Sequence, residues 1–462
     1  MTRTSWLACA AILLAALSTA SRSQPPGDER AGLPAGTELD EDTIRNPREI
    51  FHSEATHGRR SYLSSLGNLA FNSPYILGPV AQRAHLSCGT CHVNGASNPR
   101  LFVPGLSTRA GNFDTTSALF NPKTDNGVLD PLTIPSLRGA RYLAPYGHDG
   151  RALSLRDFVR SVIVGEFGGS EPSGTIVDAL VVYIQDIDFL PNPAMDGSGR
   201  LLPGASAAQR RGELLFNRPF PHDQQLSCSG CHVPSGAFVD HRQHDVGSGG
   251  LYKTPTLVNA DFNAPYFHDG RFDTYAEVID YFDSAFSLDY SPQEKADLIA
   301  YLQLAGDGVR PDYPLTGNNV LEDINGFASV LELAISNQDR EVIDLAVRTV
   351  SEQLHDLADR YPDPAGDADT SVRAAQGGKA ELALARGTLG ALRDVLRGVQ
   401  SAASTNRFDE ASVAYLQYRK LALAAAPMAL RSAERWSLFD PALHAAHRAS
   451  MHPIATASAA SH

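Results

Sequence analysis

The residues with the clearest chemical meaning in this sequence form two copies of the pentad Cys-x-x-Cys-His, Cys88–His92 and Cys228–His232. Two thiols at this spacing can add across the vinyl groups of a porphyrin while the adjacent histidine reaches the iron, which is the attachment signature of c-type haem. The sequence therefore predicts two covalently attached haem c groups. The attaching thiols would be those of Cys88, Cys91, Cys228 and Cys231, and the proximal iron ligands would be His92 and His232.

A zinc half-site and a redox dithiol are the other readings of a single pentad. Zinc requires further cysteines or a paired histidine at metal-finger spacing, and a thioredoxin-like dithiol lies on the strand-to-helix turn of a βαβ unit. The only other cysteine of the chain is Cys9. The zinc reading therefore lacks further ligands, and the dithiol reading lacks a suitable structural context.

Cys9 lies in an N-terminal stretch that is typical of a secretory signal peptide. Arg3 precedes an apolar run, Trp6 to Leu17, and small residues follow at Ser18 to Ala20. The run is short for a membrane span, and Cys9 comes too early in it for a lipoprotein. We expect residues 1–20 to be removed and the mature chain to be periplasmic without a membrane span, since c-type haem is attached outside the bacterial cytoplasm.

Length and composition are those of a multi-domain globular protein. The chain has 462 residues, of which 43% are apolar and 20% charged, so it has room for about three domains of roughly 150 residues. Its 39 Lys and Arg against 52 Asp and Glu leave a net charge of −13. This charge argues against nucleic acid as a partner; it would suit a basic redox partner or simply keep the protein soluble.

The duplication extends beyond the pentads. The segment 133–138, Thr-Ile-Pro-Ser-Leu-Arg, corresponds to 253–258, Lys-Thr-Pro-Thr-Leu-Val. The octapeptide 144–151, Ala-Pro-Tyr-Gly-His-Asp-Gly-Arg, corresponds to 264–271, Ala-Pro-Tyr-Phe-His-Asp-Gly-Arg. Between pentad and octapeptide the first copy has about twenty more residues, which we place in the Gly/Pro/Asn/Asp-rich stretch 97–131 and expect to form a loop.

Helices must position these motifs. Each copy closes with an apolar helical segment containing a tyrosine, Ile176 to Ile187 in the first and Ala296 to Leu304 in the second. Ser291 followed by Pro292 and Glu294 is a helix N-terminus signature. A pentad on an early helix and an apolar closing helix packed over the macrocycle is the arrangement of a cytochrome c domain, so a mainly α fold is predicted.

Beyond Gly306 the pattern becomes that of amphipathic helices. Apolar residues recur at steps of three and four from Val320 to Ile335 and again from Ile343 to Leu357. Further helical stretches are expected at 372–399 and 409–436. This C-terminal part contains no pentad, so a helical bundle acting as scaffold or partner surface is the favoured reading.

The predicted organisation is therefore two tandem cytochrome c-like haem domains followed by a C-terminal helical bundle. The ends of the chain, about 21–46 and beyond 450, are expected to be disordered. The segments are 1–20, signal peptide; 21–46, disordered linker; 47–195, first haem domain; 196–310, second haem domain; and 311–450, helical bundle extension.

The tandem pentads, the Thr-Pro-Thr-Leu segment and the second octapeptide resemble those of the bacterial dihaem cytochrome c peroxidases and their MauG-type relatives. The resemblance covers roughly residues 46–308 and is stronger in the second copy. It implies that the first haem, on His92, meets hydrogen peroxide and that the second, on His232, relays electrons. It also implies a small cytochrome c or cupredoxin as electron donor.

The sequence departs from this family in the expected sixth ligands. No histidine lies between Val93 and Gly147, so the first iron would be open unless a distant histidine covers it; the distant histidines are His52, His57 and His85. The methionine expected fourteen positions after His268 is replaced by Phe282. Loss of a methionine ligand should lower the potential of the second haem. Tyr281 and His244 are the alternative ligands, although each could instead be an ordinary core or loop residue.

Other family positions are also changed. The tryptophan of the first octapeptide is replaced by His148, which could serve as a polar distal group, and the nearest counterpart of the family's catalytic glutamate is Glu166. His148 and Glu166 are therefore the catalytic candidates, although the matching His268 suggests a structural role for both histidines. Family members hold calcium between their domains through an asparagine that is Thr133 here. A hard cation can use carbonyls, so calcium is possible but unsupported.

The leading hypothesis is a periplasmic dihaem oxidoreductase that reduces hydrogen peroxide with electrons from a small redox protein. A MauG-like oxidase acting on an organic or protein substrate is the alternative within the enzymes. A dihaem electron carrier without catalytic activity is the alternative outside them.

Overall fold

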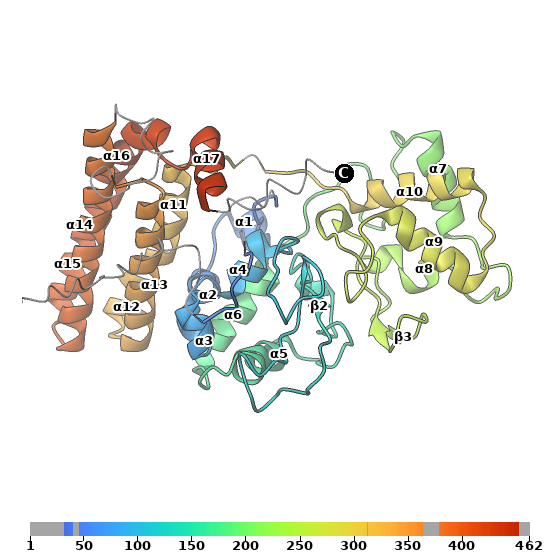
Figure 1. Ribbon diagram of the computed structural model, residues 1–462, viewed down its shortest axis with the longest axis horizontal. Coiled ribbons are helices and arrows are strands. Elements are labelled where there is room, and N and C mark those ends of the chain that lie inside the picture. The colour runs from blue at the N-terminus through green and yellow to red at the C-terminus, as the bar shows by residue number, and fades with distance from the viewer. Residues whose placement is uncertain (1–31, 40–45, 312, 364–377, 452–462) are drawn as a thin grey trace, which may run out of the picture.

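The computed structural model describes residues 32–39, 46–311, 313–363 and 378–451, where the chain is mainly helical, as predicted. Figure 1 shows three groups of elements along the long axis. The first repeat (46–195) occupies the centre, the second repeat (196–310) one end, and the C-terminal helices (317–451) the other. None of the described helices is both long and apolar enough to cross a membrane. The predicted signal peptide and most of the predicted linker lie outside the described residues.

The first repeat consists of short helices joined by long irregular segments. Its elements are α1 (His52–His57), α2 (Tyr62–Phe71), η2 (Pro74–Ile76), α3 (Pro79–Arg83), α4 (Cys88–Cys91), η3 (Val93–Gly95), β1 (Asn112–Phe113), β2 (Leu132–Thr133), η4 (Ala140–Tyr142), α5 (Leu155–Ser161), η5 (Val162–Glu166) and α6 (Gly174–Asp186).

The second repeat has the same order of principal elements. They are α7 (Ala207–Phe216), α8 (Cys228–Cys231), η6 (Pro234–Gly236), β3 (Gln243–His244), β4 (Tyr252–Lys253), η7 (Ala260–Phe262), α9 (Tyr275–Phe286) and α10 (Pro292–Gly306). The helix predicted after Ser291 is confirmed: the Ser291 side chain accepts a hydrogen bond from the Glu294 amide, and Glu294 reciprocates.

Each repeat is built on a close crossing of an early helix and the closing helix, α2 with α6 and α7 with α10. The crossings are made possible by glycine. A Cβ atom on Gly67 would lie 2.0 Å from the Ala179 carbonyl oxygen, and one on Gly212 would lie 2.1 Å from that of Asp297. No side chain fits at either distance, so both crossings require glycine.

A two-residue antiparallel ladder follows the pentad in each repeat. Asn112 pairs with Thr133 in β1–β2, and Gln243 pairs with Lys253 in β3–β4. The final residues of β2 and β4, Thr133 and Lys253, begin the duplicated segments recognised in the sequence. The ladders therefore place Thr133 and Lys253 at equivalent positions in the two repeats.

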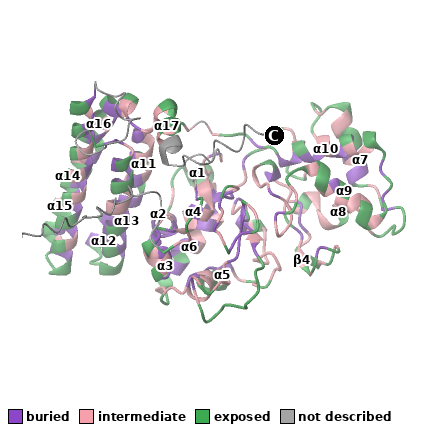
Figure 2. Ribbon diagram, in the orientation of Figure 1, coloured by how far each residue is buried: buried purple, intermediate pink, exposed green. Residues whose placement is uncertain are grey.

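The C-terminal helices pack side by side, and their apolar stripes face inward, as the purple residues between the helices in Figure 2 show. The predicted stripe from Ile343 to Leu357 is buried. The elements are α11 (Gly317–Ala328), α12 (Leu331–Ser336), α13 (Arg340–Asp359), α14 (Lys379–Ser404), α15 (Phe408–Lys420), η9 (Leu421–Ala425), α16 (Ala426–Ala433), η10 (Glu434–Trp436) and α17 (Pro441–Met451).

The core of the C-terminal helices is continuous with that of the first repeat, whereas the second repeat has a separate, smaller core. The buried Thr349 hydroxyl donates a 2.7 Å hydrogen bond to the Ser73 hydroxyl. Near it, the Arg348 guanidinium lies 3.8 Å from the centre of the Tyr75 ring. The C-terminal helices thus share a core with the first repeat.

Candidate haem sites and the contact between them

His92 is held in the orientation that a proximal iron ligand needs. Its Nδ1 lies 3.0 Å from the Pro135 carbonyl oxygen. A carbonyl can only accept, so Nδ1 carries the hydrogen and Nε2 keeps a free lone pair. Burial lowers the pKa of His92 to about 4, so the imidazole is neutral near pH 7, the form that coordinates a metal.

His232 repeats this arrangement. Its Nδ1 lies 3.2 Å from the Phe238 carbonyl oxygen, and the backbone of Pro255 is a further hydrogen-bond partner. Burial lowers the pKa of His232 below its ordinary value. Pro135 and Pro255 are matching positions of the duplicated segments, so one function of these segments is to orient the pentad histidines.

None of the four pentad cysteines forms a disulfide within the described residues, so their thiols are available for attachment. Burial raises the pKa of Cys88 to about 12 and that of Cys228 to about 11. These two thiols are therefore neutral, and they pack against the apolar cores of their repeats. Two thiols beside one correctly oriented neutral imidazole in each repeat fit a covalently attached haem, and the same residues would hold it: the cysteines by thioether bonds, the histidine at the iron.

An aromatic pair beside each pentad histidine was missed in the sequence. Phe71 lies 6.4 Å from the His92 ring and Phe216 6.5 Å from the His232 ring, measured between ring centroids. Each phenylalanine packs in turn on the tyrosine of its closing helix, at 5.0 and 5.1 Å. The signal was present as a third duplicated motif, Gly-x-Leu-x-Phe-Asn, at 67–72 and 212–217.

The two closing-helix tyrosines differ in their hydroxyl groups. The Tyr183 hydroxyl lies 3.4 Å from a Glu49 carboxylate oxygen. The buried Tyr301 hydroxyl has no hydrogen-bond partner within the described part of the chain, and its neighbours include Cys228. A buried hydroxyl without a partner costs about 1–3 kcal/mol, so this group fits a site that a further polar group completes.

The histidines of the two octapeptides lie in the contact between the repeats. The backbone amide of Lys253 donates to the His148 carbonyl oxygen at 2.9 Å, and that of Thr133 donates to the His268 carbonyl oxygen at 2.7 Å. Each octapeptide thus binds the ladder strand of the other repeat. In the duplication Thr133 corresponds to Lys253, and His148 corresponds to His268. Superposing one repeat on the other therefore exchanges the two hydrogen bonds, and the contact has an approximate two-fold symmetry.

His148, predicted as a polar distal group, uses Nε2 to donate to the Thr133 carbonyl oxygen at 2.8 Å. Burial lowers the pKa of His148 to about 4, and the nearby His268, Lys253 and Arg151 act in the same direction. The side chain is therefore neutral, and in this structure its Nε2 is committed to the backbone of its own repeat.

Lys253 has no counterpart in the first repeat, where the matching residue is Thr133. Its ammonium group donates to the Leu143 and Pro145 carbonyl oxygens at 2.7 and 2.8 Å. Burial lowers the pKa of Lys253 to about 8. A positive charge held by carbonyl oxygens thus ties the second repeat to the first octapeptide, and sequence comparison of the copies gave no sign of this role.

Glu166, the second catalytic candidate, ends the π-helical turn η5. Its Oε1 accepts a hydrogen bond from Arg151 of the first octapeptide at 2.9 Å, and Thr115 bonds to the same carboxyl. Burial raises the pKa of Glu166, although both hydrogen bonds oppose the shift. Glu166 and His148 make no direct contact in the described structure; Arg151 is the charged residue that lies near both.

The predicted loop 97–131 helps to build this region. Asn121 and Thr124 donate to the Gly165 carbonyl oxygen at 2.6 and 2.8 Å, directly before Glu166. On its other side the loop reaches the second repeat, since Asn112 donates to the Asp269 carbonyl oxygen at 2.9 Å. The extra residues of the first repeat therefore both support Glu166 and strengthen the contact between repeats.

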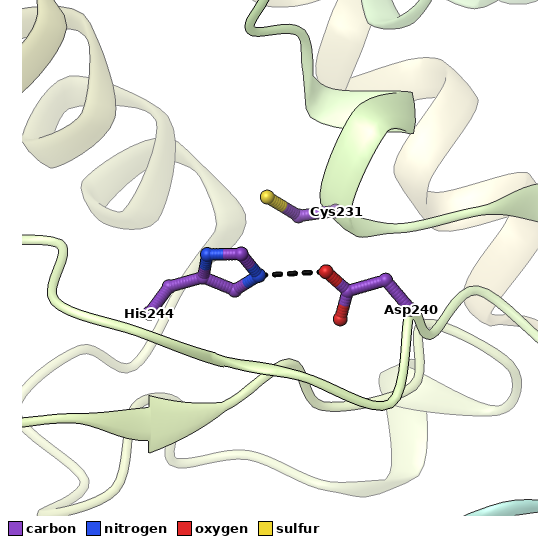
Figure 3. Close-up of side chains that lie close together, drawn as sticks. All are labelled: Cys231, Asp240 and His244. Atoms are coloured by element: carbon purple, nitrogen blue, oxygen red, sulfur yellow. Dashed lines mark hydrogen bonds and ion pairs between the residues drawn. The ribbon is translucent and has the colours of Figure 1, made fainter.

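Figure 3 shows Cys231 beside an ion pair of Asp240 and His244, with a distance of 2.6 Å between His244 Nε2 and Asp240 Oδ2. The ligand atoms of all three lie within 4.8 Å of one another. Burial would raise the pKa of Asp240, but hydrogen bonds led by that from His244 outweigh it and hold the pKa below its ordinary value. A metal could bind here only to a free Cys231 thiolate, so attachment of haem excludes it.

The remaining histidines considered as sixth ligands have other partners. His52 Nδ1 lies 3.1 Å from Asp188, and His57 Nδ1 lies 2.7 Å from the Thr56 hydroxyl. His85 forms an ion pair with Glu352 of the C-terminal helices.

Tyr281, considered as an iron ligand for the second haem, also has a hydrogen-bond partner. The Tyr281 hydroxyl donates to the Val246 carbonyl oxygen at 2.8 Å, and its ring packs against Phe267 and Phe282. The structure thus places Phe282, the residue at the expected methionine position, in an aromatic cluster with Tyr281.

Residues 209–300 match the family model of di-haem cytochrome c peroxidase. Hydrazine synthase subunit gamma of Kuenenia stuttgartiensis is 31% identical over 142 residues, which are 26% of this chain and 38% of that protein. Cytochrome-c peroxidase IdrP1 of Pseudomonas sp. (strain SCT) is 34% identical over 77 residues, 14% of this chain and 20% of that protein. The matches thus span well under half the length of either relative.

A solved structure of Kuenenia stuttgartiensis hydrazine synthase aligns with 65% of this chain and 100% of its own, at 21% identity and a TM-score of 0.39. The family resemblance inferred from the sequence is confirmed by the match of residues 209–300, which contain the second pentad and the second octapeptide.

Proposed function

We propose that this chain, which carries a segment of the di-haem cytochrome c peroxidase family, is a periplasmic dihaem c-type oxidoreductase that reduces hydrogen peroxide. A small cytochrome c or cupredoxin would supply the electrons. The observation that carries the proposal is the reciprocal contact of the two octapeptides. It holds two pentad-bearing repeats in a fixed relation, which an enzyme with one reacting site and one electron-relaying site requires.

In this proposal residues 47–195 and 196–310 are cytochrome c-like haem domains, and residues 311–450 are a helical extension. When bound, haem supplies an iron that exchanges electrons and can bind peroxide. The protein's part is to keep His92 and His232 neutral and oriented, through the carbonyl oxygens of Pro135 and of Phe238 with Pro255. In the contact between the repeats, the Lys253 ammonium group supplies a positive charge that binds carbonyl oxygens.

Glu166 is the residue we assign to proton transfer. Arg151 holds Oε1, and the raised pKa lets the carboxyl take up and release a proton nearer to neutral pH than an exposed glutamate would. His148 is assigned a positioning role, because its Nε2 hydrogen is held by the Thr133 carbonyl oxygen. Glu166→Gln should therefore reduce turnover much more than His148→Gln.

The test is steady-state turnover of hydrogen peroxide by the holoprotein with reduced cytochrome c. His92→Ala should abolish both turnover and the spectral change that peroxide causes, whereas His232→Ala should lose turnover but still bind peroxide. His57→Ala is the control and should leave turnover unchanged, because His57 is exposed and its ring bonds to the neighbouring Thr56 hydroxyl. The reverse pattern at His92 and His232 would mean that the roles of the two haems are exchanged.

Two further results would exclude a peroxidase. If both haems are low-spin and bind neither peroxide nor cyanide, the chain is an electron carrier. If peroxide produces a long-lived oxidised state that cytochrome c does not discharge, the chain is a MauG-like oxidase of an organic or protein substrate. Phe282 at the methionine position, beside Tyr281, favours this second candidate, because MauG-type relatives also lack methionine there.

A further inference from the structure

Helix α15 is apolar on two opposite faces. Its inward face is buried in the C-terminal helices through Ala411, Tyr415 and Tyr418, which are 0%, 4% and 1% exposed. On the opposite face Val413 and Leu416 are 68% and 57% exposed. The inward face accounts for the packing of the helix, so a second apolar face has no role within the described chain.

Charged residues bracket the exposed apolar pair. Asp409 lies four positions before Val413, and Lys420 four positions after Leu416, so the four side chains follow one line along the helix. We call them the outer stripe. Both charged residues are exposed, and within the described ranges neither has an ion-pair partner.

The exposed face of α13 is composed differently. Its exposed positions Glu341, Asp344 and Arg348 are all charged, and the Arg348 guanidinium packs on Tyr75 of the first repeat. On α15 the exposed positions Val413 and Leu416 are instead apolar, and beyond its end Leu423 of η9 and Met428 of α16 are 68% and 73% exposed. Exposed apolar side chains of this kind are typical of a contact with another molecule.

The order acid, apolar, apolar, base makes the outer stripe complementary to itself. When two α15 helices lie antiparallel about the midpoint between Val413 and Leu416, each Asp409 faces Lys420 of the other copy. In the same arrangement each Val413 faces Leu416 of the other copy. A two-fold contact requires such a self-complementary patch, and this spacing satisfies it with all four residues.

We propose that two copies of this chain associate through the outer stripe of α15 as an antiparallel two-fold dimer. Figure 1 shows α15 at the end of the molecule far from the second repeat. The dimer therefore leaves the contact between the repeats accessible to a redox partner. The proposal stands independently of the haem chemistry.

The experiment measures the association of the full-length holoprotein by sedimentation equilibrium over a range of concentrations. Asp409→Lys opposes two lysines across the axis, and Lys420→Asp opposes two aspartates. Each single variant should weaken dimerisation by roughly tenfold or more, since like charges are placed directly opposite one another. Glu341→Lys makes the same charge change in the first turn of α13 and should leave the dimer intact.

Exchange of the charges provides the decisive comparison. The double variant Asp409→Lys/Lys420→Asp restores both ion pairs and should dimerise like the parent. An equimolar mixture of the two single variants should form the heterodimer, because each supplies the charges that the other lacks. A parent protein that stays monomeric at high concentration, or a mixture that fails to associate, would overturn the proposal. Unchanged haem content and turnover in all variants would show that they fold.

Discussion

The two repeats carry the same local chemistry in different surroundings. His92 and His232 are oriented through backbone carbonyl oxygens, and Phe71 and Phe216 take matching places beside them. The first repeat, however, shares a continuous core with the C-terminal helices, whereas the second has a small core of its own. The residues proposed to attach haem therefore lie in local motifs that the duplication preserved, and the difference between the two candidate sites comes from what surrounds each motif.

The polar groups near the two candidate sites are also distributed unequally between the repeats. Glu166 and its partners Arg151 and Thr115 belong to the first repeat. The half-buried Lys253 and the pair of Asp240 and His244 belong to the second. Each repeat has a carboxyl whose pKa is raised by burial, Glu166 in the first and Asp261 in the second. They differ in their partners: Glu166 is bonded to Arg151, whereas Asp261 accepts a hydrogen bond from the Tyr275 hydroxyl.

The largest expected effect comes from removing one haem at a time. Cys88→Ser/Cys91→Ser and Cys228→Ser/Cys231→Ser should each retain one attached haem of the two, measured by mass and haemochrome absorbance. Because a small core depends more on its cofactor, only the second-repeat variant should lose amide-exchange protection in its helix pair, α7 and α10. Equal loss of protection in α2 and α6 of the first-repeat variant would contradict the unequal cores.

The second largest effect should come from substituting the glycines at the helix crossings. Gly67→Ala and Gly212→Ala each place a Cβ atom about 2 Å from a backbone oxygen, so the helices must separate, at a cost of about 3 kcal/mol in unfolding free energy. Gly387→Ala on α14 meets nothing within 4 Å and should stabilise by about 0.5–1 kcal/mol. Denaturant unfolding of the three holoproteins measures the difference, and a neutral Gly212→Ala would argue against the crossing.

The octapeptide histidines should differ in their effect on acid stability. The folded pKa of His148, about 4, lies below the ordinary value of 6.5, so the unfolded chain binds more protons between these pH values. Stability is therefore complete above pH 6.5 and falls as the pH decreases through this window, by roughly 3 kcal/mol. His148→Gln keeps a donor for the Thr133 carbonyl oxygen and should remove this pH dependence.

His268 is the matched control for that measurement. Its pKa is also lowered by burial, but its ring stacks on Tyr252, with 3.7 Å between ring centroids, and Asp269 opposes the shift. His268→Gln should change the pH profile of unfolding less than His148→Gln does. Equal changes would show that the two octapeptides are electrostatically equivalent.

The smallest effect concerns the contact between the first repeat and the C-terminal helices. Thr349→Val and Ser73→Ala each remove one hydroxyl of a buried hydrogen-bonded pair, and each should lower the unfolding free energy by about 1 kcal/mol. A double-mutant cycle should show coupling between them. Absence of coupling would mean that the two hydroxyls do not share a hydrogen bond in solution.

Sequence alone was sufficient where the physics is local. The pentads at Cys88 and Cys228 predict haem attachment because thiol spacing along the chain is itself the signal, and the Ser291 capping motif predicted its helix because caps involve residues three positions apart. The apolar stripes beyond Gly306 predicted helices for the same reason. Glu166 could be named only as the nearest counterpart of a glutamate in the family that the sequence resembles, and its partners Arg151 and Thr115 could not be named.

The tertiary structure decided everything that depends on pairs distant in sequence. Thr133 with His268 and Lys253 with His148 are contacts between the two repeats, and no spacing within either copy reveals them. Gly67 and Gly212 matter only because a closing helix crosses there. The sequence by itself determined which groups can attach two haems. Packing decided how the two sites face one another and why they are unequal, because burial, charge and contact are properties of neighbours in space.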